Sequence, residues 1–87
     1  MRYYKFHWNE SRGDQYDSWG TSNWFIEVGE DLYPNRQIEI YENGKKLKYS
    51  NDKLEDEFGG LSDQKFNESE FDCERSSEQE FEKLWLQ

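Results

Sequence analysis

The dipeptide Asn43-Gly44 separates a run rich in β-branched and aromatic residues, 36–42, from a second alternating run, 45–49. Both residues of the dipeptide tolerate the positive φ angles that a two-residue type I′ turn requires. Because alternating runs on either side of such a turn form an antiparallel hairpin, the sequence predicts a β-hairpin over residues 36–49. This is the strongest local restriction on the fold.

The register of this hairpin is expected to follow from its charges and its apolar side chains. With Glu42 opposite Lys45, apolar residues meet on one face and opposite charges meet on the other. The remaining pairs would be Ile40 with Leu47, Glu39 with Lys48 and Ile38 with Tyr49. A slip of one residue would destroy both matches, so we expect this register.

Two further strands are expected before the hairpin, in residues 4–8 and 24–28. Apolar and polar side chains alternate there with a period of two, which is typical of a half-buried strand. The apolar positions are Tyr4, Phe6, Trp8, Trp24, Ile26 and Val28. A long polar loop over residues 9–23 is expected between the strands, and a connection over residues 30–35 leads to the hairpin.

The C-terminal segment predicts an α-helix. Ser77 and Glu80 have the spacing of a capping box, in which a hydroxyl and a carboxylate satisfy the first backbone N–H groups. The residues expected to form the apolar stripe are Phe81, Leu84 and Trp85, with Glu78 and Glu82 facing away. Such a short helix must be stabilised by packing on the sheet.

The composition indicates how a core can be built. Leu, Ile, Val and Phe supply only 16 of 87 residues and Ala is absent, a content usually seen in disordered chains of this charge. However, there are 16 aromatic residues, each of which can bury roughly 150–250 Å². We expect Phe66 and Phe71 to act as single anchors, and the spacing of Leu54, Phe58 and Leu61 is compatible with a short helix.

These patterns predict one domain over residues 1–87 with an α+β fold. The expected architecture is an antiparallel β-meander of about four strands with the C-terminal helix packed on one face. Whether residues 50–75 are ordered without a partner is left open. The sequence has no apolar run that would form a signal peptide or a membrane anchor, so we expect a cytoplasmic protein.

Charge is distributed unevenly along the chain. The formal net charge is −9, and residues 50–87 carry twelve acidic but only four basic side chains. This balance argues against binding to nucleic acid or to an anionic membrane, because both need a basic surface. It favours a basic protein partner, which the acidic surface would attract over long distances.

The order of the motifs resembles a family of small acidic bacterial proteins. The matching segments are Tyr3-x-Lys5-Phe6-x-Trp8, Trp24-Phe25-x-Glu27, Arg36-Gln37-Ile38-Glu39-Ile40-Tyr41-Glu42-Asn43-Gly44 and Ser77-x-x-Glu80-Phe81-Glu82-x-x-Trp85. The chain departs from the family in its longer loop over residues 9–23 and in Phe6 and Ile38, where Val is usual. Proteins of this kind are similar to immunity proteins of polymorphic and contact-dependent toxin systems. The resemblance therefore implies an antitoxin, and it carries no catalytic motif.

Residues suited to catalysis or to metal binding are scarce. His7 is the only histidine, and its strand position is opposite in phase to Phe6 and Trp8, so a solvent-facing side chain is the simpler interpretation. Cys73 lies among acidic residues, which would raise its pKa and reduce its reactivity. One thiol cannot form an internal disulfide or a zinc site. We therefore expect no enzyme, no metal and no cofactor.

The aromatic residues offer one candidate for partner binding. Trp8, Trp19 and Trp24 could form a stacking platform for a sugar or a base, although the acidic surroundings disfavour a nucleic-acid base. Core packing is the simpler interpretation for Trp8 and Trp24. Trp19 lies in the polar loop and is harder to explain as core, so we expect an exposed aromatic anchor there. The candidate carboxylates are those of the charge-dense half, Glu55, Asp56, Glu57, Glu68, Glu70, Asp72 and Glu74. Solubility alone is the simpler explanation for this cluster.

The sequence therefore predicts an immunity protein that occupies the substrate-binding surface of a basic toxin nuclease. An acidic DNA mimic, which would inhibit a restriction or CRISPR nuclease, is the alternative. Regular spacing of carboxylates would favour mimicry, whereas the sequence shows clustering. A cleft holding a carboxylate with a strongly raised pKa would instead favour an enzyme.

Overall fold

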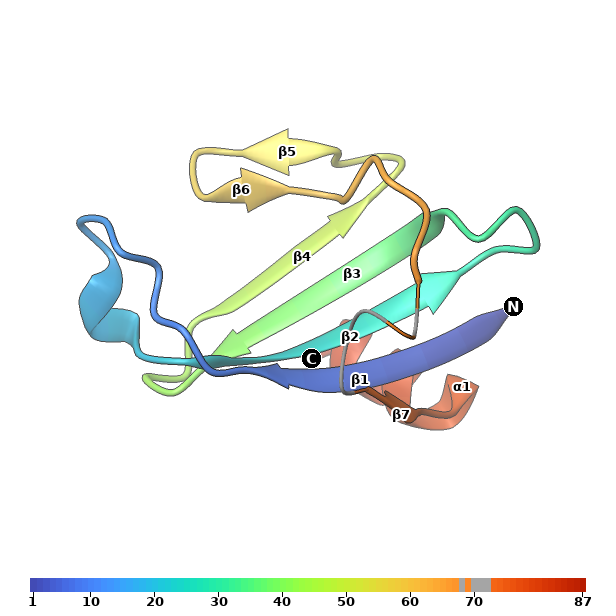
Figure 1. Cartoon of the computed structure of the whole chain (residues 1–87), viewed down its shortest axis with the longest axis horizontal. Coiled ribbons are helices and arrows are strands. Elements are labelled where there is room, and N and C mark those ends of the chain that lie inside the picture. The colour runs from blue at the N-terminus through green and yellow to red at the C-terminus, as the bar shows by residue number, and fades with distance from the viewer. Residues whose placement is uncertain (68, 70–72) are drawn as a thin grey trace.

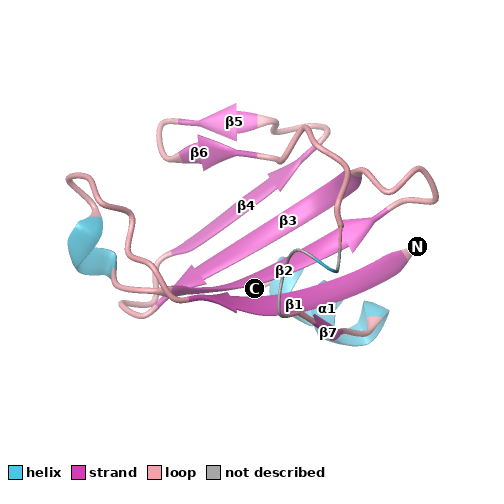
Figure 2. Cartoon of the chain, in the orientation of Figure 1, coloured by secondary structure: helices cyan, strands magenta, loops and turns pink. Residues whose placement is uncertain are grey.

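The computed structural model describes residues 1–67, 69 and 73–87. Its centre is an antiparallel sheet with the strand order β4-β3-β2-β1-β7 (Figure 1). These strands are β1 (Arg2–Trp8), β2 (Ser22–Val28), β3 (Pro34–Tyr41), β4 (Lys46–Ser50) and β7 (Glu74–Arg75). Figure 2 also shows helix α1 (Glu78–Trp85), a 3₁₀ turn (Asp17–Trp19) and a ribbon of β5 (Glu55–Asp56) and β6 (Gly59–Gly60). The expected meander with a C-terminal helix is confirmed.

Both faces of this sheet carry apolar side chains. Tyr4 and Phe6 point to one face of β1, where they form a core cluster with Phe66. Tyr3 points to the other face and packs against Phe81 of α1, with 5.5 Å between the ring centroids. Alternate residues of one strand are therefore buried on opposite sides. None of the helices in the described ranges is long and apolar enough to cross a membrane.

Helix α1 begins and packs largely as expected. The Ser77 hydroxyl accepts a hydrogen bond from the backbone N–H of Glu80 at 3.0 Å, and Phe81 is fully buried. Leu84 and Trp85 pack beside it on the sheet. The expectation that Glu82 faces away is wrong, because its carboxylate accepts a hydrogen bond from Arg36.

An ion pair lies between the sheet and α1. Arg36 of β3 donates two hydrogen bonds to Glu27 of β2, at 2.9 Å from Nε and 2.6 Å from Nη2. The same carboxylate accepts a hydrogen bond from the Tyr3 hydroxyl at 2.9 Å. The Arg36 guanidinium also lies over the rings of Phe81 and Trp85, 4.9 and 5.1 Å from their centroids. One cation thus joins three strands and the helix.

The predicted register of the hairpin is wrong by one residue. The observed pairs are Arg36 with Ser50, Gln37 with Tyr49, Ile38 with Lys48, Glu39 with Leu47 and Ile40 with Lys46. Gly44 N–H donates to the Tyr41 carbonyl at 2.9 Å, and Gly44 alone of the Asn43-Gly44 pair has a positive φ, of 90°. The loop therefore has three residues and ends in a left-handed glycine, the usual alternative to the two-residue turn.

The contacts of Lys48 give a physical reason for this register. Its ammonium donates to the backbone carbonyl of Trp85 at 2.6 Å, at the C-terminal end of α1. A helix C-terminus leaves carbonyl groups without helical partners and carries partial negative charge, so a lysine is favoured there. Lys48 consequently lies on the helix-facing side of β4. The cross-strand pair with Glu39 does not form.

The segment that contains Leu54, Phe58 and Leu61 forms the β5–β6 ribbon. The prediction of a short helix there is wrong. Asp56 accepts hydrogen bonds from the backbone N–H groups of Phe58 and Gly59, at 2.8 and 3.2 Å, and so closes a turn. Such side-chain bonds compete with a helix, which Gly59-Gly60 disfavours as well. Phe66 is buried as expected. Phe71 lies outside the described residues.

Substitution of Glu27 tests the ion pair. Hydrogen bonds from Arg36, the largest cause, hold the pKa of Glu27 below its ordinary value of 4.5. Its contribution to the free energy of unfolding is therefore present above that value and lost as pH falls through the lowered pKa. Glu27→Gln should reduce the free energy of unfolding at pH 7 by about 2–3 kcal/mol. The free energy of unfolding of the variant should also fall less steeply as pH is lowered. Urea unfolding at a series of pH values from pH 7 to pH 2 measures both effects.

The matched control is the same substitution in an Arg36→Met background, which keeps an apolar side chain against Phe81. There the loss should be much smaller, because the cation is already absent. An equal loss in both backgrounds would contradict the role assigned to the pair.

Candidate interaction site

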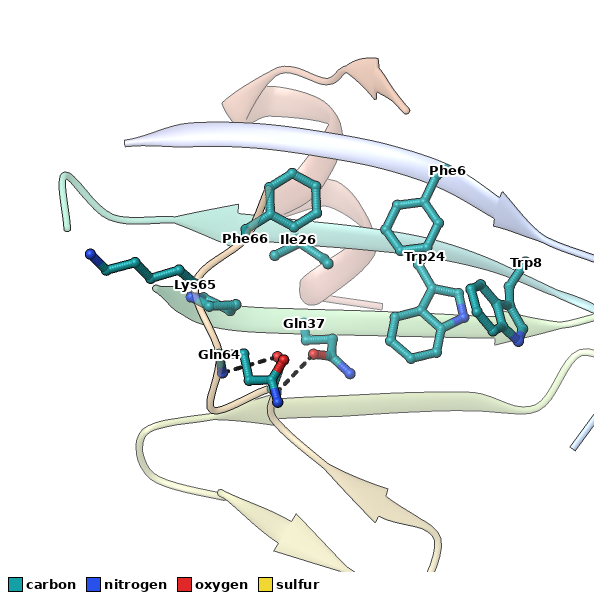
Figure 3. A pocket seen from close by; sticks show the side chains of 10 residues that line it. Phe6, Trp8, Trp24, Ile26, Gln37, Gln64, Lys65 and Phe66 are labelled. Atoms are coloured by element: carbon teal, nitrogen blue, oxygen red, sulfur yellow. Dashed lines mark hydrogen bonds between the residues drawn. The ribbon is translucent and has the colours of Figure 1, made fainter. Parts of the chain in front are cut away.

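Two adjoining clefts lie on the face of the sheet opposite α1. The first encloses about 410 Å³ between β1, β2 and the segment that ends at Phe66. Figure 3 shows its lining, in which Trp8 and Trp24 lie at one end and Lys65 lies at the other. The residues that line it are Phe6, Trp8, Trp24, Ile26, Pro34, Gln37, Ser62, Gln64, Lys65 and Phe66. Most of this surface is apolar.

The second cleft encloses about 360 Å³ and shares Trp8 and Trp24 with the first. The loop after β1 and the β5–β6 ribbon flank it. Its charged lining residues are Glu10, Arg12, Asp14 and Glu39. The two tryptophans therefore separate an apolar cleft from a polar one, and both clefts reach the same pair of rings.

Trp24 is held by Ser22 and Phe6, and Trp8 packs beside Trp24. The Trp24 indole N–H donates to the Ser22 hydroxyl at 2.8 Å, and the Trp24 ring lies 5.7 Å from that of Phe6. The Trp8 ring is 6.4 Å from that of Trp24, tilted by 49°. Trp8 remains 41% exposed, so the expectation that it packs in the core is wrong, whereas Trp24 does pack against the core.

Glu39 is the buried carboxylate of the second cleft. It accepts hydrogen bonds from the Tyr41 hydroxyl at 2.8 Å and from the Gln37 amide at 2.9 Å. Burial raises the pKa of Glu39 above its ordinary value, and these hydrogen bonds oppose the rise. A carboxylate of this kind in a cleft is a feature of enzymes. Here each oxygen accepts one hydrogen bond from a neighbouring side chain, so the carboxylate is already held in place.

Arg12 closes the far side of the second cleft. It donates hydrogen bonds to the Tyr41 hydroxyl at 3.0 Å and to the Phe58 carbonyl, and its Nε faces the Asp14 carboxylate at 3.6 Å. Its guanidinium lies 5.5 Å from the Trp19 ring centroid. Arg12 thereby joins the loop after β1 to the β5–β6 ribbon.

The structure gives Trp19 a packing role that the sequence did not indicate. Trp19 is half-buried, and its ring contacts those of Tyr16, Tyr41 and Phe58 at centroid distances of 4.8, 5.2 and 5.3 Å. These contacts account for an aromatic residue in a polar loop. A partner contact through Trp19 stays a prediction.

The predicted carboxylates do not gather at one place. Glu55 and Glu57 are exposed on the ribbon, whereas Glu74 is exposed on β7 at the opposite edge of the sheet (Figure 1). Asp56 is engaged internally, since it accepts a hydrogen bond from the Tyr49 hydroxyl at 2.9 Å and pairs with Lys53 at 3.5 Å. Glu68, Glu70 and Asp72 lie outside the described residues.

The other chemical candidates have simple environments. His7 is exposed, and its Nδ1 lies 2.8 Å from the Asn23 side-chain oxygen. Cys73 is half-buried against the Tyr4–Phe66 cluster. Within the described ranges, no three His, Cys, Asp or Glu side chains are grouped so that they could hold a metal ion.

Sequence reasoning missed Glu10 and Glu39 as site residues, and it favoured core packing over a binding role for Trp8 and Trp24. The available signal was the position of Trp8 at the end of an alternating strand, directly before a polar loop. Comparison with protein-family models, with curated proteins and with solved structures gives no match.

A neutral substitution at Glu39 should reveal its raised pKa. Because the folded protein retains this proton to higher pH than the unfolded chain, Glu39 makes the free energy of unfolding fall as pH rises from 4.5 through the raised pKa. Glu39→Gln should remove that fall. In urea unfolding at a series of pH values, the wild-type free energy minus that of the variant should decrease with pH and then level off. A difference that increases with pH would contradict the assignment.

Proposed function

We propose that this chain is a cytoplasmic immunity protein, which acts by binding rather than by catalysis. Its partner would be a cognate bacterial toxin with a basic nuclease domain, whose substrate-binding surface it would occupy. The proposal is supported chiefly by one observation. In the described structure most basic side chains have partners within the molecule, whereas many carboxylates face solvent without one.

Most described basic side chains are engaged within the molecule. Arg36 binds Glu27 and Glu82, and Lys5 lies 3.3 Å from Glu80. Others are held by neutral oxygens: Arg12 by Tyr41 and Phe58, Lys46 by the Gln87 side chain at 2.7 Å, and Lys48 by the Trp85 carbonyl. These cations are thereby held in place by contacts within the molecule.

Many carboxylates have no such role. Eight exposed ones form neither an ion pair nor a side-chain hydrogen bond with the residues that the structure describes: Glu10, Glu30, Asp52, Glu55, Glu57, Asp63, Glu74 and Glu78. A surface with this imbalance attracts cationic proteins over long distances and raises their rate of association. A nuclease needs a basic surface to hold nucleic acid, so it is a matching partner.

Growth rescue tests the proposal. The toxin domain encoded beside this gene would be expressed with and without this chain, and the chain should restore growth.

The rate of association between this chain and the toxin domain is a second measurement. Glu57→Lys, on the ribbon beside the second cleft, should lower that rate at low salt by about tenfold. Glu30→Lys, which makes the same charge change in the turn after β2, serves as the matched control and should have a smaller effect.

Two outcomes would contradict the immunity proposal. One is failure of the wild-type chain to restore growth. The other is binding to several unrelated basic proteins with release of all of them at physiological salt, which is the behaviour of the alternative, an acidic DNA mimic. A specific immunity complex should lose less than about a hundredfold in affinity between low and physiological salt.

A further inference from the structure

We propose that Trp8 and Trp24, with the carboxylates of Glu10 and Glu39, form the seat for an arginine side chain of the basic partner. The inference deepens the proposed function and rests on it in one respect, the identity of the partner as a basic protein. It is argued from how this chain places its own arginines.

Arg36 provides the first example. Its planar guanidinium lies over two aromatic rings, those of Phe81 and Trp85, and is hydrogen-bonded to the carboxylates of Glu27 and Glu82. Arginine suits this arrangement because its flat, delocalised cation stacks on rings while its N–H groups reach carboxylates.

Arg12 provides the second example, beside the candidate site. Its guanidinium lies 5.6, 5.5 and 5.9 Å from the ring centroids of Tyr16, Trp19 and Tyr41. Asp14 faces it on one side, and Tyr41 links it to the carboxylate of Glu39. Two aromatic clusters of the fold are thus occupied by an arginine together with a carboxylate.

The Trp8–Trp24 pair also combines aromatic rings with nearby carboxylates, and Arg12 lines the same cleft. Among the described residues, no lysine or arginine lies over either ring. Figure 3 shows the Lys65 side chain directed away from the tryptophans, and its ammonium lies 6.0 Å from the Tyr33 ring instead. Arg12 is held by Tyr41, Phe58 and Asp14. Neither neighbouring cation therefore occupies the pair.

Carboxylates lie beside this tryptophan pair, of which Trp8 is exposed and Trp24 is half-buried. Glu10 and Glu39 line the second cleft together with Trp8 and Trp24. Each oxygen of Glu39 accepts one hydrogen bond, whereas a carboxylate has about four acceptor sites, so it retains capacity for a further donor. A cation in this cleft would meet the two tryptophans and these carboxylates, with Arg12 held apart by Tyr41, Phe58 and Asp14. That complementarity selects an arginine of the partner as the occupant.

The test uses the full chain labelled with ¹⁵N and two short peptides. The first probe is acetyl-Gly-Arg-Gly-amide, and the second contains citrulline, which is neutral and nearly isosteric with arginine. The chain has four tryptophans, so four indole N–H signals report on it at once. Trp19 and Trp85 are internal controls, because the guanidinium groups of Arg12 and Arg36 already lie over their rings.

The arginine peptide should shift the Trp8 and Trp24 signals with a dissociation constant in about the millimolar range, and leave those of Trp19 and Trp85 in place. The citrulline peptide should bind at least about tenfold more weakly. Trp8→Ala should abolish the response of Trp24, and Glu10→Gln should weaken it. Equal effects of both peptides, equal shifts at all four indoles, or no shift at Trp8 would overturn the inference.

This outcome is independent of growth rescue. Peptide binding without rescue would leave the arginine seat intact and refute the immunity function. Rescue without peptide binding at Trp8 would support the function and refute the seat. Because Trp8 is largely exposed at the end of β1, Trp8→Ala is expected to fold, and Glu10→Gln supplies a second variant on the exposed loop.

Discussion

The contact between Arg36 and Glu27 determines how the rest of the molecule is arranged. The two residues lie opposite each other on β3 and β2, and Tyr3 of β1 binds the same carboxylate. This pairing neutralises a buried charge, and it presents the guanidinium to the rings of α1. Without it, the helix-facing side of the sheet would hold an unpaired buried ion, which is strongly unfavourable. The helix therefore packs on a surface that combines this ion pair with aromatic and aliphatic side chains, among them Tyr3, Ile38 and Ile40.

A chain with few aliphatic residues achieves its packing by this means. Aromatic rings bury a large area each, and their faces attract cations, so Arg12 and Arg36 lie over aromatic rings, whereas Arg2 and Arg75 are exposed. The consequence for function is that positive charge is used internally while many carboxylates face solvent. The result is an anionic surface with one exposed tryptophan, Trp8, beside the half-buried Trp24, and the proposed binding of a basic partner rests on that arrangement.

The sequence predicted the elements that depend on local patterns, and missed the features that depend on distant contacts. The strands around Phe6 and Ile26 and the Ser77 cap could be predicted because alternation and capping involve neighbouring residues. The hairpin register could not, because Lys48 is drawn to a carbonyl 37 residues away, at the end of α1. The candidate site was missed for a similar reason. Trp8 is exposed because the segment ending at Phe66 covers only part of its face of the sheet, and no local pattern in β1 encodes that coverage.

The central claim is that the face opposite α1, at Trp8, is where a basic protein binds. The most direct measurement is the set of intermolecular nuclear Overhauser effects in a complex of this chain with the toxin domain that it neutralises. The account predicts contacts between the ring protons of Trp8 and the δ-methylene protons of an arginine in the partner. Contacts confined to α1, with Trp85 as the aromatic residue involved and none at Trp8, would contradict it.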